Sequence, residues 1–173
     1  MRKPGPGQEE RPLTVFTDDY RIEGALLTST MVRTLDDLNN DSTFFTLNRV
    51  EPTADAPELR EGPLSVNKEA ILFVLEREER PALQSRGRFA LSAIDLRLGE
   101  HRVEGLLHVP PGGQPKPLLD ARTPRFIAIT RAKVTGPGIE VEASFLAVRR
   151  GAIQFVQVLG PDATAAAETE PAR

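Results

Sequence analysis

The chain has 173 residues and a net charge of −3, with 39% hydrophobic and 27% charged residues, which suits one globular domain or two small ones. It contains no Cys, so disulfides, thiolate metal sites and Cys nucleophiles are excluded. The apolar runs reach only about five residues, far short of the roughly 20 that a membrane helix needs, and no apolar stretch follows the basic start. We therefore expect a cytoplasmic protein without membrane contact.

The first part of the chain is predicted to form five short strands behind a disordered tail over residues 1–12. Residues 13–17 alternate apolar and polar side chains, which is typical of a half-buried strand. The same reasoning predicts strands at residues 21–27, 44–50, 63–68 and 70–76. Gly24 lies inside the second strand, where a glycine often marks a bulge or a sharp bend. We assign residues 13–75 to a first unit.

The stretch "TLDDLNNDSTFF" (34–45) raises the question of a metal site. Asp37, Asn39 and Asp41 are spaced as in a calcium loop, but that loop also needs a Gly and a Glu where Ser42 and Asn48 stand. A short helix explains the stretch better. Thr34 is a good N-cap residue, and the acids that follow suit the first helical turn. We expect this helix to plug one mouth of a small barrel.

The second part of the chain repeats the pattern. A linker is expected over residues 76–93, a second unit over 94–160 and a disordered tail over 161–173. Within the second unit we predict strands at residues 94–98, 102–108, 125–134, 142–150 and 152–159. Gly105 occupies the place of the first unit's strand glycine. A short helix is predicted at "PLLDA" (117–121), again as a plug, because Pro favours the first helical position.

The two units match residue by residue, which favours an internal duplication. "YRIEGALL" (20–27) resembles "HRVEGLLH" (101–108) at an offset of 81. "FFTLNRV" (44–50) resembles "FIAITRA" (126–132), and "LSVNKEAILFV" (64–74) resembles "LAVRRGAIQFV" (146–156), both at an offset of 82. Two copies are too few for a solenoid, so a tandem of small domains is the better interpretation.

Each unit resembles the Sm-like fold, a small five-stranded barrel of the SH3 type. In that family a glycine lets the second strand bend, and Gly24 and Gly105 stand at that place. "DDLNND" (36–41) matches the family's Asp-x-Asn loop, which implies RNA contact by Asn39. The second unit keeps only Asp120 of that motif. The tandem is also similar to an uncharacterised bacterial domain family. The expected fold is thus mainly β, with two Sm-like barrels in tandem.

Charge separates the two units. Residues 13–75 hold 5 Lys/Arg and 11 Asp/Glu, a net charge of −6, whereas residues 94–159 hold 9 and 6, a net charge of +3. The difference in charge is explained simply if the two units only have differently solvated surfaces. The other possibilities are that the units bind different partners, or that a unit of one molecule binds the opposite unit of another.

No catalytic motif or cofactor site is evident, so we expect a protein that is not an enzyme. The two histidines, His101 and His108, fall on opposite faces of one predicted strand and cannot share a metal there. "PPGGQPKP" (110–117) lacks the spacing of a P-loop. The function predicted first is a non-catalytic adaptor or scaffold that binds protein through its sheet edges. The alternative is Sm-like RNA binding by the basic second unit.

Eight residues are the candidate contacts to a protein or RNA partner. Three lie in or beside the Asp-x-Asn stretch, and five are arginines of the second unit: Asp37, Asn39, Phe44, Arg122, Arg125, Arg131, Arg149 and Arg150. We also expect one strand edge to be paired inside the chain, between "AILFVLE" (70–76) and the second unit. The two remaining edges belong to units of opposite charge, which predicts a head-to-tail homo-oligomer.

Overall fold

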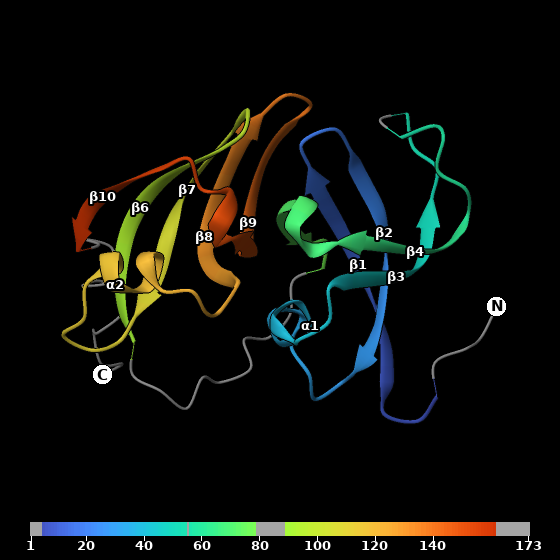
Figure 1. Cartoon of the computed structure of the whole chain (residues 1–173), viewed down its shortest axis with the longest axis horizontal. Helices are drawn as coiled ribbons and strands as arrows, with labels where there is room; N and C mark the ends of the chain where they lie inside the picture. Colours follow the sequence, from blue (N-terminus) through green and yellow to red (C-terminus); the bar gives the residue numbers. More distant parts are fainter. Residues whose placement is uncertain (1–4, 55, 79–88, 162–173) are drawn as a thin grey trace, which may run out of the picture.

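Ten antiparallel strands form one open sheet in the computed structural model, which describes residues 5–54, 56–78 and 89–161 (Figure 1). The strands lie in the order β10-β6-β7-β8-β9-β5-β1-β2-β3-β4. The first half of the sheet consists of β1 (Gln8–Thr17), β2 (Arg21–Ser29), β3 (Phe44–Glu51), β4 (Gly62–Asn67) and β5 (Ile71–Glu76). The second half consists of β6 (Ala90–Leu98), β7 (His101–Val109), β8 (Phe126–Gly136), β9 (Ile139–Arg149) and β10 (Phe155–Pro161). The mainly β fold and the ten expected strands are therefore confirmed.

Short helical segments connect the strands at equivalent places in the two halves. Helix α1 (Thr34–Asn39) follows β2, and α2 (Pro115–Asp120) follows β7. The 3-10 turns η1 (Lys68–Ala70) and η2 (Arg150–Ala152) precede the last strand of each half. The predicted helices thus exist. Helix α1 begins with Thr34 inside it, because Arg33 rather than Thr34 takes the extended N-cap position.

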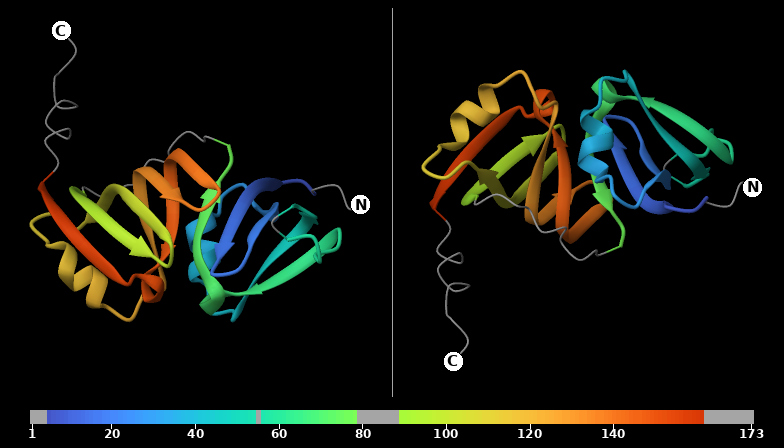
Figure 2. Two further views of the ribbon diagram at one scale, coloured as in Figure 1. Left: turned by 90° about the horizontal axis from the view of Figure 1, so that it is seen from above. Right: turned by 90° about the horizontal axis from the view of Figure 1, so that it is seen from below.

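The two halves have the same strand order and register. The order is β5-β1-β2-β3-β4 in the first half and β10-β6-β7-β8-β9 in the second. Phe16 lies opposite Phe73 between β1 and β5, and Arg97 lies opposite Phe155 between β6 and β10. These pairs are related by the same offsets of 81 and 82 that align the sequence. Figure 2 shows the halves as two curved lobes side by side.

The expected pair of closed barrels is not formed, since the sheet is open. In the first half β4 does not pair with β5, because β5 uses its second edge to pair with β9. Phe73, Val74 and Leu75 of β5 lie opposite Val148, Ala147 and Leu146 of β9. The pairing expected between "AILFVLE" and the second unit is therefore confirmed, and it joins the two halves into one sheet.

Two predicted boundaries need correction. The tail expected over residues 1–12 is wrong from Gln8 onward, because β1 begins there and pairs with β2 from Gln8 to Phe16. The linker expected over 76–93 is too long, because Glu76 ends β5 and residues 90–93 belong to β6. Residues 1–4, 79–88 and 162–173, on which the other tail and linker expectations fall, lie outside the described residues.

Gly24 and Gly105 lie where two strands approach closely. A Cβ at Gly24 would collide with the carbonyl oxygen of Arg49 in β3, and one at Gly105 would lie 2.6 Å from Cγ2 of Ile129 in β8. The register between β7 and β8 also shifts at Gly105. Both strands therefore need a residue without a side chain at this position.

The hydrophobic core consists of two clusters, and each cluster includes residues from both halves of the chain. The cluster of the second half includes three residues from the first: Phe16, Leu72 and Phe73. The cluster of the first half includes Phe126 and Ala147 from the second. The junction between β5 and β9 is therefore a continuous part of both cores.

Candidate functional site

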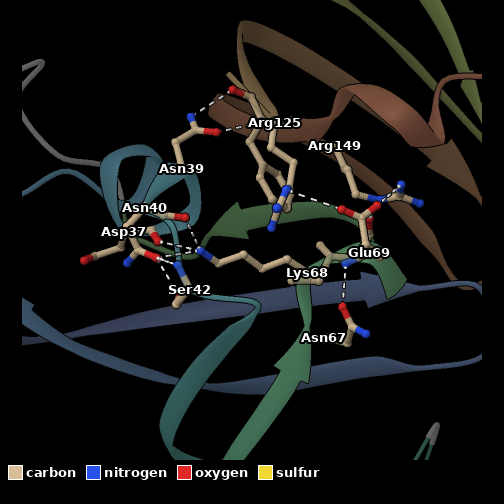
Figure 3. A network of polar contacts seen from close by, with 11 residues as sticks. Asp37, Asn39, Asn40, Ser42, Asn67, Lys68, Glu69, Arg125 and Arg149 are labelled. Carbon is tan, nitrogen blue, oxygen red and sulfur yellow. Dashed lines mark hydrogen bonds and ion pairs between the residues drawn. The ribbon is translucent and has the colours of Figure 1, made fainter. Parts of the chain in front are cut away.

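The acidic stretch forms helix α1, and a buried lysine closes its end. Lys68 is fully buried, and its ammonium donates hydrogen bonds to the carbonyl oxygens of Asp37 (3.3 Å) and Asn40 (3.0 Å) and to Oδ1 of Asn40 (2.8 Å). These acceptors lie at the negative end of the helix, where a cation is favourable. Burial lowers the pKa of Lys68, Arg125 adds to this effect, and the nearby acids Asp37 and Asp41 oppose it. The stretch is therefore organised around a lysine of the protein itself (Figure 3).

Asn39 connects the two halves. Its side-chain amide donates to the carbonyl oxygen of Phe126 (3.0 Å) and its Oδ1 accepts from the backbone N–H of Phe126 (2.7 Å). The amide thus satisfies both backbone groups at the start of β8, as a neighbouring strand would. Asn39 was a candidate contact to a protein or RNA partner, and the structure places its side chain against the other half of the chain (Figure 3).

Two of the five candidate arginines also lie at the junction. Arg125 pairs with Glu69 through Nε (3.3 Å), and Arg149 pairs with the same carboxylate through Nη1 (3.2 Å). Nε of Arg149 donates to the carbonyl oxygen of Ile71 (2.6 Å). Glu69 belongs to η1 of the first half, so the ion pairs cross the junction where β5 begins (Figure 3).

The other five candidate residues bond within their own half or are exposed. Asp37 accepts a hydrogen bond from Thr28 (2.6 Å), and Arg150 donates to the carbonyl oxygen of Leu118 (3.2 Å) at α2. Phe44, Arg122 and Arg131 are exposed. The structure therefore does not gather the eight candidates into one surface, and it uses three of them to hold its halves together.

An aromatic cluster covers another part of the junction. Phe16 and Phe73 stack with ring centroids 4.4 Å apart, and the ring of His101 from the second half lies edge-on to both, at 5.7 and 5.2 Å. Burial lowers the pKa of His101, a backbone hydrogen bond at Leu98 and the charge of Glu100 act in the opposite direction, and Arg97 lowers it further. Burial in the cluster therefore favours the neutral imidazole of His101.

The outer edges of the sheet are the surfaces left for a partner. Among the described strands, β10 pairs only with β6 and β4 only with β3. Strand β10 carries three exposed apolar side chains, Phe155 (59%), Val158 (47%) and Leu159 (56%). We call β10 and its open side the outer edge. An apolar edge strand with unpaired backbone groups is a template for another strand.

The sequence predicted a free strand edge in each unit, but it did not predict that β10 would expose apolar side chains. The patterns "AIQFVQVL" and "AILFVLE" are similarly apolar, yet β5 is mostly buried and β10 is mostly exposed. Phe155 is the counterpart of the fully buried Phe73 at an offset of 82. The difference in burial between Phe73 and Phe155 could have been suspected from the order of the units. Only one of the two equivalent strands, β5 or β10, can be covered by the other unit of the same chain.

No family model, no curated protein and no solved structure matches the chain. Within the part of the chain that the structure describes, neither helix has the length and apolar character to cross a membrane. The candidate site therefore rests on the geometry alone.

Proposed function

We propose that the chain is a non-catalytic protein-binding module, an adaptor or scaffold made of two Sm-like β-units, and that it binds an extended protein segment along the outer edge. The exposed Phe155, Val158 and Leu159 on an edge strand carry this proposal. A segment added to β10 would satisfy the open backbone groups and cover these side chains.

The junction between the halves supports the same conclusion. Strand β5, the counterpart of β10, is covered by β9, and its Phe73 and Val74 are fully buried. Burying an apolar side chain of this size contributes about 1.5–3 kcal/mol. Strand addition at the equivalent edge therefore gains both hydrogen bonds and buried apolar area.

The RNA alternative has less support. Sm-like RNA contact would use Asn39, whose amide is bonded to Phe126, and the arginines Arg125 and Arg149, which pair with Glu69. Of the five candidate arginines only Arg122 and Arg131 are exposed, which leaves few cations for phosphate contacts.

The test is affinity capture from an extract of the source organism, analysed for both protein and RNA. Phe155→Asp places a charge on the outer edge, and Met31→Ser removes an apolar side chain that is 84% exposed and follows the interior strand β2. We expect a defined protein partner to be captured by the wild type and by Met31→Ser, and to be lost with Phe155→Asp.

Two results would overturn the proposal. One is protein capture that Phe155→Asp leaves unchanged. The other is salt-sensitive capture of RNA that is lost on replacing Arg122 and Arg131 by Gln, because the second unit would then be an RNA-binding surface.

A further inference from the structure

We propose that the segment bound at the outer edge is β4 of a second copy of this chain, docked in the register that β9 uses on β5. This inference rests on the proposed function and names its partner. The junction inside the chain is its template, because the two open edges of the sheet are the counterparts of the two edges that the junction joins.

The geometry of the edges is consistent with this docking. Strand β5 pairs with β1 on one side and β9 on the other, and β10 pairs with β6, the counterpart of β1. The open side of β10 is therefore equivalent to the side of β5 that pairs with β9. Strand β4 is the counterpart of β9 and is likewise open on the equivalent side.

The template fixes the residue pairs. In the junction Phe73, Val74 and Leu75 lie opposite Val148, Ala147 and Leu146. An offset of 82 places Phe155 opposite Val66, Val156 opposite Ser65, and Gln157 opposite Leu64 of the second copy. Pro63, which cannot donate a backbone hydrogen bond, falls just outside this three-residue ladder.

Three exposed aromatic side chains are the counterparts of buried junction residues. Phe155, Phe44 and Tyr20 are 59%, 52% and 41% exposed, whereas their counterparts Phe73 and Phe126 are fully buried and His101 packs on Phe16 and Phe73.

Docking would bring these aromatic side chains together across two molecules. Tyr20 of the second copy would take the place of His101 and lie against Phe155 and Arg97, the counterparts of Phe73 and Phe16. Phe44 of that copy would take the place of Phe126.

The polar bonds of the junction have no equivalents between molecules, so the contact is weaker than the template. In the proposed contact, the offset of 82 puts Ala121 in the place of Asn39, Gly151 in the place of Glu69 and Asn67 in the place of Arg149. The units that meet carry −6 and +3, which favours the encounter and makes it sensitive to salt. We therefore expect reversible, concentration-dependent association.

Cysteine cross-linking tests the register, because the chain has no Cys of its own. Ser65→Cys and Val156→Cys are made in separate molecules, mixed in equal amounts and oxidised with copper phenanthroline. Directly opposite residues of antiparallel strands have Cβ atoms about 4.5–5.5 Å apart, so a disulfide needs only a small adjustment. We expect a cross-linked product of two 19.0 kDa chains from the mixture and little from either variant alone.

A second mixture is the matched control. Ser65→Cys with Gln157→Cys is one residue out of register, and these side chains lie on opposite faces of the pleat, so we expect far less product. Light scattering of the cysteine-free chain should give a mass above 19.0 kDa that rises with concentration, and Tyr20→Ala or Phe155→Asp should return it to the monomer.

Either of two outcomes overturns self-docking. These are a mass of 19.0 kDa at every concentration, or equal cross-linking in both mixtures, which means that no register is specified. If another protein is still captured through Phe155 in that case, the proposed function stands with a different partner. If self-docking is observed but capture of other proteins is independent of Phe155, only the adaptor role fails.

Discussion

Lys68 is the residue on which the acidic stretch depends. Its ammonium is buried and satisfies two carbonyl oxygens and one amide oxygen at the end of α1. A buried cation is costly unless it is fully hydrogen-bonded, and here each hydrogen bond goes to a neutral acceptor, close to the acids of the helix. The lysine therefore links η1, which leads into β5, to the helix that faces the second half.

We expect Lys68→Met to lower the free energy of unfolding by about 1–3 kcal/mol, because it removes three part-buried hydrogen bonds at the end of α1. Urea denaturation measures the change. Lys116→Met is the matched control, since Lys116 is exposed and pairs with the exposed Asp120 on α2, and its effect should stay within about 0.5 kcal/mol. Equal stability of the Lys68→Met variant and the wild type would contradict this account of the stretch.

Asn39 shows what sequence could and could not predict at this scale. The short helix was predicted from Thr34 and the acids after it, and the calcium alternative failed on spacing. The amide of Asn39 could be selected as a recognition group, but its partner, Phe126, is 87 residues away. Local patterns carry no information on such a contact. For the same reason the pairs of Arg125 and Arg149 with Glu69 could not be foreseen.

The ten strands could be predicted because alternation and β-branched runs are local signals. Their closure could not, because β5 and β10 have nearly the same apolar pattern and differ only in what covers them. Strand β5 meets β9, while β10 remains at the outer edge. The match at an offset of 82 identified equivalent strands, but burial depends on neighbours that equivalent strands do not share.

The aromatic contact between the halves should make stability depend on pH. Burial lowers the pKa of His101 and of His108 from the usual value of 6.5. The unfolded chain therefore takes up protons first as pH falls below about 6.5, and the stability present above that value is progressively lost down to the folded-state pKa. We expect the melting temperature to fall between pH 7 and pH 5.

His101→Phe separates the two histidines in this experiment. Phe preserves the ring beside Phe16 and Phe73 but cannot be protonated, so the pH dependence should shrink to the part that His108 contributes. His108 lies 2.9 Å from the hydroxyl oxygen of Thr130, and His108→Gln should remove that remaining part. The same pH dependence of the melting temperature in the wild type, in His101→Phe and in His108→Gln would rule out this role for both rings.

The whole molecule should unfold as one unit, because its two cores share residues across the junction. Phe126 of β8 is fully buried in the cluster of the first half, and Phe73 of β5 is fully buried in that of the second. Neither half can separate without exposing such side chains to water. The single Tyr of the chain, Tyr20, lies in the turn between β1 and β2 of the first half, and there is no Trp to mask its fluorescence.

We expect urea unfolding followed by Tyr20 fluorescence to coincide with unfolding followed by circular dichroism, which reports on both halves, at concentrations where the chain is monomeric. Ile129→Ala removes a side chain that belongs only to the second-half cluster, and a loss of about 2–5 kcal/mol should nevertheless shift the Tyr20 transition. Phe126→Ala, at the junction itself, should cost about 3–5 kcal/mol and shift both signals together. If Ile129→Ala moved the circular dichroism curve and left the Tyr20 curve in place, the halves would be independent domains, and the junction would be too weak to serve as a template for contact between molecules.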